Sequence, residues 1–280
     1  MSPDHAAALV IPQWQGYAAD DRPRLGALAL ARALGGAQHT VAVPAWRALT
    51  GEPTDDGPVY GLRDIVEQAA AARAWLEAIN PQRLLVVGGD CGSDVAPIGW
   101  QARRCGDDLG VLYLDAHADS NTPASSPSGR FHGMVVRAAL GDGAPMLAAR
   151  GSAAITAAQL VMAGCRDLDP PERDFLDAAG VRPWPAAAIG DGHVLGAVLA
   201  HRARRWHVHF DLDVLDPADF PEVTIPTPHG TTLAAVTELL LGLAAQRTLV
   251  GLTITEHVGG EPSAGRIAAM IATLREHGWR

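Results

Sequence analysis

Short apolar runs recur along the chain and alternate with longer segments that have helical periodicity. Seven runs predict buried strands, at residues 8–11, 40–43, 84–87, 111–114, 160–164, 206–210 and 249–254. Most are continuously apolar rather than alternating, which is typical of strands buried on both faces. Helical spacing of apolar residues is seen at 62–79, 233–245 and 263–276. This alternation predicts an α/β fold in which helices cover both faces of a mostly parallel sheet.

Composition places the chain among ordinary globular proteins. It has 280 residues, of which 19% are charged, and a formal net charge of −9. No linker or repeat interrupts the pattern, so we expect a single domain over residues 1–280. The acidic balance and the lack of an extended basic cluster disfavour nucleic-acid binding.

The N-terminal segment and the cysteines bear on cellular location. We find neither a signal-peptide pattern nor an apolar segment long enough to cross a bilayer, so we expect a cytoplasmic protein without membrane contact. An odd, low number of cysteines, at positions 91, 105 and 165, argues against a disulfide framework.

The most informative polar residues follow the apolar run at 111–114. Asp115, His117 and Asp119 are spaced two apart, and residues at this spacing on a strand share one face. We interpret them as converging where a strand opens into a loop. Two carboxylates and an imidazole on one face indicate a divalent-metal site rather than core packing.

Two other predicted strands end in similar residues, Asp211 and Asp213 in one case and Asp90 and Cys91 in the other. Ligands of a parallel sheet bind beyond the carboxyl ends of its strands, so these strand ends are predicted to share one site. An aspartate after a strand is usually a turn or capping residue. This structural interpretation suits Asp216 and stays open for Asp90.

Clustered carboxylates favour bound cations, because burying them together is costly unless positive charge compensates. Carboxylate ligands with one or two imidazoles suit Mn²⁺, with Mg²⁺, Fe²⁺ or Co²⁺ as alternatives. Two such ions, about 3.5–4 Å apart, would lower the pKa of a water between them. We therefore expect two manganese ions per chain and hydrolytic chemistry.

Three motifs, in this order, resemble those of the arginase, or ureohydrolase, family. They are Gly88-Gly89-Asp90-Cys91, Asp115-Ala116-His117-Ala118-Asp119 and Phe210-Asp211-Leu212-Asp213-Val214-Leu215-Asp216-Pro217. The resemblance implies a three-layer α/β/α sandwich with a mostly parallel sheet of about eight strands. It implies one ion held by Cys91, Asp115, Asp119 and Asp211. The second ion would be held by Asp115, His117, Asp211 and Asp213.

The resemblance also assigns substrate-binding residues. By position, Asn121, Ser128 and Arg130 would bind the α-carboxylate of an amino acid, and Asp169 and Glu172 would bind its α-ammonium group. Taken alone, Glu172 is a first-turn helix residue favoured by the helix dipole. The matches imply a small guanidino amino acid as substrate, rather than decarboxylated agmatine, with L-ornithine as one product.

The catalytic residues implied by the resemblance are His132, Asp119 and Glu256. His132 would shuttle protons, and Glu256 falls where the family places a glutamate near the guanidinium group. Taken alone, His132 is an exposed loop histidine. The family includes dimers to hexamers, and for this chain a monomer and a homo-oligomer both stay open.

Two positions depart from the family pattern. Arg130 stands where arginases carry a smaller polar residue, and its guanidinium could bind a carboxylate bidentately. Cys91 stands where a histidine ligand is expected, and is either a thiolate ligand or a small buried residue where a ligand has been lost. A thiolate would add negative charge, weaken the Lewis acidity of the metal pair and admit Zn²⁺ or Fe²⁺ more readily.

The Cys91 substitution resembles that of one branch of the family, the Nω-hydroxy-L-arginine amidinohydrolases of D-cycloserine-type antibiotic biosynthesis. These release hydroxyurea and L-ornithine, and we expect this activity here. We hypothesise that the altered metal pair suits the less basic, N-hydroxylated guanidine. One alternative is an arginase or another guanidino-acid hydrolase. A metal-binding pseudoenzyme is a second, although the retained His132, Glu256 and carboxylates argue against it.

Overall fold

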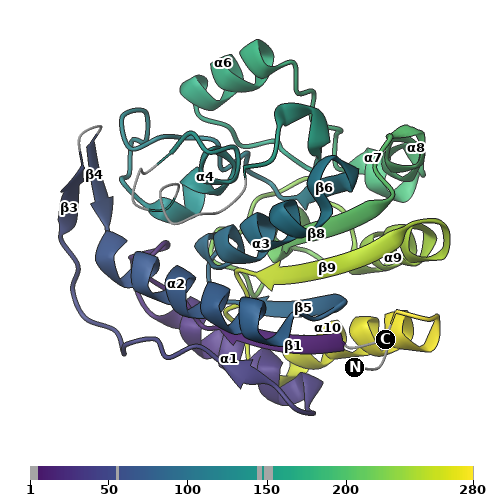
Figure 1. Cartoon of the computed structure of the whole chain (residues 1–280), viewed down its shortest axis with the longest axis horizontal. Coiled ribbons are helices and arrows are strands. Elements are labelled where there is room, and N and C mark those ends of the chain that lie inside the picture. The colour runs from purple at the N-terminus through teal and green to yellow at the C-terminus, as the bar shows by residue number, and fades with distance from the viewer. Residues whose placement is uncertain (1–5, 55–56, 144–146, 148–153, 280) are drawn as a thin grey trace.

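A parallel sheet forms the middle layer of the molecule (Figure 1). The computed structural model describes residues 6–54, 57–143, 147 and 154–279. The strands of this sheet are β1 (Ala6–Ile11), β2 (His39–Thr40), β5 (Arg83–Gly88), β6 (Leu109–Leu114), β7 (Leu160–Ala163), β8 (Arg205–Asp211) and β9 (Thr248–Thr255). They lie in the order β2-β1-β5-β9-β8-β6-β7, and every pairing is parallel.

Helices cover both faces of the sheet, which confirms the three-layer α/β/α sandwich. One face carries α2 (Leu62–Ile79), α3 (Val95–Cys105), α4 (Val135–Ala139) and α6 (Pro170–Ala179). The other carries α1 (Arg22–Leu34), α7 (Ala187–Gly190), α8 (His193–Ala200), α9 (Leu233–Gln246) and α10 (Glu261–Glu276). Within β5, Leu84 and Val86 belong to the first core and Leu85 and Val87 to the second. Burial on both faces explains why the strands are continuously apolar.

Most elements follow the sequence pattern closely. Each of the seven apolar runs overlaps a strand of the main sheet, and α2 has the bounds that its periodicity predicts. The run at 40–43 differs, because only His39 and Thr40 pair, at the edge of the sheet. The main sheet in the described chain has seven strands rather than eight. An antiparallel pair, β3 (Gly51–Thr54) and β4 (Gly57–Tyr60), was not predicted.

Four neighbouring strands end at the same level, and this alignment positions the site. The register pairs Leu114 of β6 with Phe210 of β8, and Phe210 with Ile254 of β9. Ile254 in turn pairs with Val87 of β5. The loops that follow these four strands therefore leave the sheet side by side, at its carboxyl edge.

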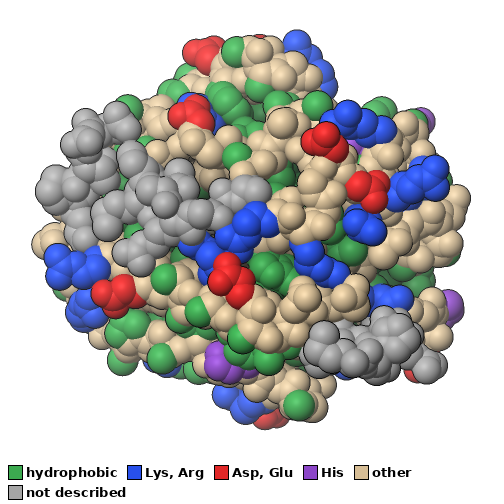
Figure 2. All heavy atoms as spheres, viewed as in Figure 1, with side chains coloured by type: hydrophobic (Ala, Val, Ile, Leu, Met, Phe, Trp, Pro, Cys, Tyr) green, Lys and Arg blue, Asp and Glu red, His purple; other side chains and the backbone are tan. Residues whose placement is uncertain are grey.

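The face of the molecule shown in Figure 2 carries charged side chains of both signs. On the face shown in Figure 2, basic and acidic side chains are interspersed among uncharged ones. None of the helices within the described residues combines the length and apolarity that crossing a membrane requires.

Candidate metal centre and substrate pocket

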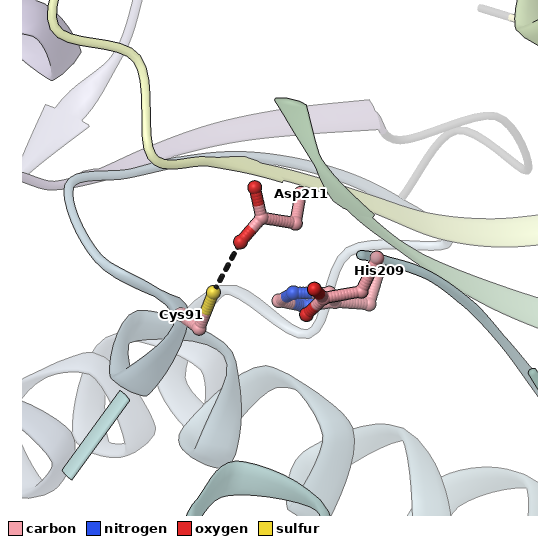
Figure 3. Close-up of side chains that lie close together, drawn as sticks. Cys91, His209 and Asp211 are labelled. Atoms are coloured by element: carbon pink, nitrogen blue, oxygen red, sulfur yellow. Dashed lines mark hydrogen bonds between the residues drawn. The ribbon is translucent and has the colours of Figure 1, made fainter. Parts of the chain in front are cut away.

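The loop after β5 brings a thiol to the centre of the site. Gly89 lies against the backbone of Gln13, where a Cβ would be 1.8 Å from the carbonyl oxygen, so only glycine fits. Cys91 opens a short 3₁₀ helix (Cys91–Asp94), and its Sγ lies 2.8 Å from Oδ2 of Asp211 (Figure 3). Burial, followed by the charge of Asp211, raises the pKa of the Cys91 thiol well above its usual value. A metal ion bound beside a thiol favours its ionised form.

Asp115, His117 and Asp119 lie in the loop after β6, which ends at Leu114. The prediction that they share one face of a strand is therefore wrong, and hydrogen bonds within the loop orient them instead. Oδ1 of Asp115 accepts a 2.6 Å hydrogen bond from the backbone N–H of His117. Asp119 has a φ of 48°, in the left-handed region, and its Oδ2 accepts a 2.6 Å hydrogen bond from the Tyr113 hydroxyl.

Asp211 and Asp213, at the end of β8, connect this strand to the loop after β6. Oδ1 of Asp211 accepts a hydrogen bond of 2.7 Å from the backbone N–H of Asp213. The two oxygens of Asp213 reach the other loop: Oδ1 accepts from the backbone N–H of Ala116 at 3.0 Å, and Oδ2 lies 3.0 Å from Nδ1 of His117. These contacts bring acidic and imidazole groups from two strands to one place.

Potential metal-ligand atoms form two groups in the described part of the chain, and within each group the atoms lie no more than 4.8 Å apart. The first group consists of Cys91, Asp115, His209 and Asp211. The second consists of Asp115, His117 and Asp213. Asp115 belongs to both groups, as a ligand that bridges two ions would.

These groups differ from the expected ligand sets at three residues. Asp211 was expected in both sets as a second bridging ligand and belongs only to the first group. Asp119 lies outside both, with one oxygen on the Tyr113 hydroxyl. His209 lies within the first group, although no sequence motif pointed to it. Its position two residues before Asp211 on β8 was the available signal, since this spacing places two side chains on one face of a strand.

The buried charges of the site are unbalanced without a cation. Burial and then repulsion between neighbouring carboxylates raise the pKa of Asp115, Asp119 and Asp211. Although burial opposes it, the charge of His117 lowers the pKa of Asp213. Among the described residues, Oδ2 of Asp115 is buried and has no hydrogen-bond partner. Carboxylates, imidazoles and a thiol in this state fit a pair of divalent ions.

A cavity of about 120 Å³ adjoins the cluster. Its lining includes Cys91 and five of the residues proposed to handle substrate, which are Asn121, Ser128, His132, Asp169 and Glu172. Arg130 is not part of this lining.

Glu172 combines a structural and a substrate-facing position. It forms a capping box with Asp169 at the start of α6, in which its Oε2 accepts from the backbone N–H of Asp169 at 3.0 Å. Its Oε1 accepts from the backbone N–H of Ser120 at 2.9 Å. Asn121 also reaches Asp169, donating from Nδ2 to Oδ2 at 3.0 Å. The start of α6 and the loop after β6 thus form one hydrogen-bonded wall of the pocket.

Arg130 lies beside Ser128, which is part of the pocket lining. The Ser128 hydroxyl accepts a hydrogen bond of 3.2 Å from the backbone N–H of Arg130. The guanidinium carbon of Arg130 lies 5.6 Å from the centre of the Tyr17 ring, in a cation–π contact.

His132 and Glu256 form a pair beside the thiol. Nδ1 of His132 lies 3.4 Å from Oε1 of Glu256, and their side chains are 13% and 1% exposed. The same Oε1 accepts a hydrogen bond of 3.0 Å from the backbone N–H of Cys91, while Oε2 accepts one from the Thr224 hydroxyl. Glu256 thereby links the loops after β5 and β9.

Asp90 and Asp216 are structural residues. Oδ1 and Oδ2 of Asp90 accept hydrogen bonds from the Gln13 side chain and from the backbone N–H groups of residues 16, 17 and 92. Oδ1 and Oδ2 of Asp216 accept from the backbone N–H groups of residues 218 and 230. Both aspartates thus hold loops, as their positions after strands indicate.

Comparison with known proteins gives consistent matches over most of the chain. The sequence model of the Arginase family matches residues 52–273. An arginase of Brevibacillus brevis is 38% identical over 154 residues, which cover 52% of this chain and 51% of that protein. The N(omega)-hydroxy-L-arginine amidinohydrolase of Streptomyces lavendulae is 33% identical over 211 residues, or 74% of each chain.

The fold matches more completely. The solved structure of the arginase from Bacillus caldovelox has a TM-score of 0.86 and 25% identity, and the match covers 97% of this chain and 98% of that chain. The sequence match to the Brevibacillus brevis protein spans only about half of that relative's length. The family model nevertheless covers well over half of this chain. The chain therefore belongs to the Arginase family.

Proposed function

We propose that this protein is a two-metal amidinohydrolase that converts Nω-hydroxy-L-arginine into L-ornithine and hydroxyurea. The observation that carries the proposal is the buried Cys91 thiol within a group of carboxylate and imidazole ligands. Family membership supports the reaction class. The Streptomyces lavendulae relative, named for this activity, supports the substrate. Hydrolysis of L-arginine is the second candidate, favoured by the relatives named arginase.

The proposed cofactor is a pair of Mn²⁺ ions, held by the two ligand groups that share Asp115. When bound, they would supply Lewis-acid activation of a water for attack on the guanidino carbon. The cavity beside Cys91 leaves room for a small substrate to approach both groups.

His132 is suited to handle the proton that the leaving amine needs. Water adds to the guanidino carbon, the bond from this carbon to the side-chain nitrogen of ornithine breaks, and that nitrogen takes up a proton. The contact with Glu256 holds the imidazole, and the partial exposure of its side chain allows proton exchange with solvent.

The other end of the pocket suits the amino-acid part of the substrate. Asp169 and Glu172 offer carboxylates for an α-ammonium group, and both line the cavity. Asn121 and Ser128 offer uncharged polar groups for an α-carboxylate, at the same cavity. This division of charge favours an α-amino acid over a decarboxylated guanidine.

Product identification tests the proposal. The protein is incubated with added Mn²⁺ and either L-arginine or Nω-hydroxy-L-arginine, and products are identified by mass spectrometry. We expect L-ornithine from the hydroxylated substrate at the higher rate, together with hydroxyurea. Faster release of urea from L-arginine would establish the second candidate instead. No turnover of either substrate by metal-loaded protein would contradict the enzyme proposal.

Replacing the thiol tests its link to the hydroxylated substrate. We expect Cys91→His to lower the ratio of hydroxyurea to urea formation, because the substitution replaces a negatively charged thiolate ligand with a neutral imidazole. Cys105→Ser is the control, since Cys105 lies at the end of α3 and outside both ligand groups. An unchanged product ratio in Cys91→His would show that the thiol does not determine which substrate is preferred.

A further inference from the structure

His209 is a fully buried histidine with one nitrogen held and one nitrogen free. Its Nδ1 lies 2.9 Å from Oδ2 of Asp94, and its ring stacks on Tyr113 with centroids 4.1 Å apart. Among the described residues, Nε2 is buried without a hydrogen-bond partner. Figure 3 shows the ring extending from β8 toward Cys91, beside Asp211.

Asp94 determines which nitrogen of His209 is free. Its carboxylate also contacts Nε2 of His207 at 3.0 Å and the Thr253 hydroxyl at 2.5 Å. An ionised carboxylate can only accept hydrogen bonds, so both imidazoles donate to it. A neutral His209 then carries its proton on Nδ1 and keeps a lone pair on Nε2. Metal-binding histidines commonly have this arrangement, in which a carboxylate holds the other ring nitrogen.

His207 shows that an unpartnered nitrogen alone is not enough. It lies two residues earlier on β8, contacts the same carboxylate and also has one nitrogen, Nδ1, without a partner among the described residues. That nitrogen faces Gly251, where even a Cβ would be only 2.3 Å away. His207 belongs to neither ligand group, whereas His209 belongs to the first.

We propose that Nε2 of His209 is a ligand of the metal ion that also binds Cys91, and that Asp94 positions this imidazole. The proposal rests on the two-metal function given above. Ligand atoms bound at about 2.0–2.3 Å from one ion lie at most about 4.6 Å apart, so the group needs only small shifts to close around an ion. One ion would then have a thiolate, an imidazole and two carboxylates as ligands.

This ligand set changes the role of Asp119. The group contains the imidazole of His209 and lacks Asp119, which the family resemblance assigned to the same ion. Asp119 then keeps its hydrogen bond with the Tyr113 hydroxyl and faces the cavity. Tyr113, which also stacks on His209, becomes a contact shared by both residues.

Metal titration of two matched variants tests the proposal. His209→Gln removes the imidazole, and His207→Gln makes the same change two residues away against the same carboxylate. Mn²⁺ binding to chelator-treated protein is followed by isothermal titration calorimetry. Loss of even an outer partner of a ligand weakens metal binding by about 10–100-fold, so His209→Gln should weaken one site at least tenfold, and His207→Gln less. Equal affinities in wild type and His209→Gln would contradict the proposal.

Nitrogen NMR of the wild-type protein gives a readout that does not depend on a variant folding. Protein with ¹⁵N-labelled histidine is titrated with diamagnetic Zn²⁺. We expect large shifts for the nitrogens of two imidazoles, His117 and His209, and His209→Gln should remove one of them. If His117 alone responds while the protein binds two ions and forms product, His209 is not a ligand and the proposed function stands. Protein that binds no metal overturns both.

Discussion

The buried carboxylate of Asp94 and the buried carboxylates around Asp115 both contact or lie near His209, and they differ in how their charge is balanced. Asp94 accepts hydrogen bonds from His207, His209 and Thr253. Although burial opposes it, contact with the two imidazoles lowers the pKa of Asp94. Asp115 has an oxygen without a partner among the described residues, and burial raises its pKa. The chain thus satisfies the first carboxylate and leaves the second unbalanced.

The difference indicates where a cation belongs. A buried charge is tolerated when opposite charge and hydrogen bonds compensate it, and otherwise it is neutralised or binds an ion. Asp94 has its compensation in the chain, whereas the cluster around Asp115 requires it from outside. His209 is the residue that joins the two, because one nitrogen faces Asp94 and the residue belongs to the ligand group of Asp115.

Removing the metal should have the largest effect on turnover and stability, because it leaves the carboxylates around Asp115 without a compensating charge. Treatment with a chelator should abolish turnover. It should also lower the free energy of unfolding by about 2.7 kcal/mol for each site held at 100 times its dissociation constant, or about 5.4 kcal/mol for the two sites together. Urea denaturation with and without chelator measures the loss, and added Mn²⁺ should restore it. Identical denaturation curves would show that the carboxylates around Asp115 are balanced without a cation.

The fold could be predicted well from the sequence because apolar runs and helical periodicity are both local signals. Buried parallel strands require continuous apolar runs, and α2 has helical periodicity along its whole length. The pair β3 and β4 was missed because Pro53, Gly57 and Pro58 are not typical of strands. Its pairing depends on backbone contact rather than on an apolar pattern.

The site residues that could be predicted from the sequence are those whose positions at the ends of strands bring them together. Asp211 ends its strand, and Asp115 and Cys91 follow theirs. Because these strands end level, parallel topology brings the three residues together. A histidine within an apolar strand is usually a core residue, and His209 differs locally from His207 in being closer to Asp211, which is a weak signal. The distinction comes from long-range packing: the free nitrogen of His207 faces Gly251, whereas His209 lies in the ligand group with Cys91 and Asp211.

Replacing Asp94 should have the next largest effect. Asp94→Asn leaves two buried imidazoles without their carboxylate, so the free energy of unfolding should fall by about 3–5 kcal/mol. The loss of a partner that orients a ligand should also weaken metal binding by about 10–100-fold. Thr253→Val is the control, because it removes one hydrogen bond to Asp94 and leaves both imidazole contacts. Unaltered metal affinity in stable Asp94→Asn protein would show that Asp94 does not position a metal ligand.

The smallest effect is expected from replacing Arg130, which lies beside the pocket and belongs to neither of the two sets of buried charges. Arg130 contacts Tyr17 and does not line the cavity, so it is not buried against the cluster. Arg130→Ala should raise KM by no more than about fivefold, which corresponds to the roughly 1 kcal/mol of an exposed ion pair. Steady-state kinetics and metal titration should show unchanged kcat and unchanged metal affinity. A large fall in kcat would mean that Arg130 turns into the pocket when substrate binds, and that turnover depends on this half-buried charge as well as on the fully buried ones.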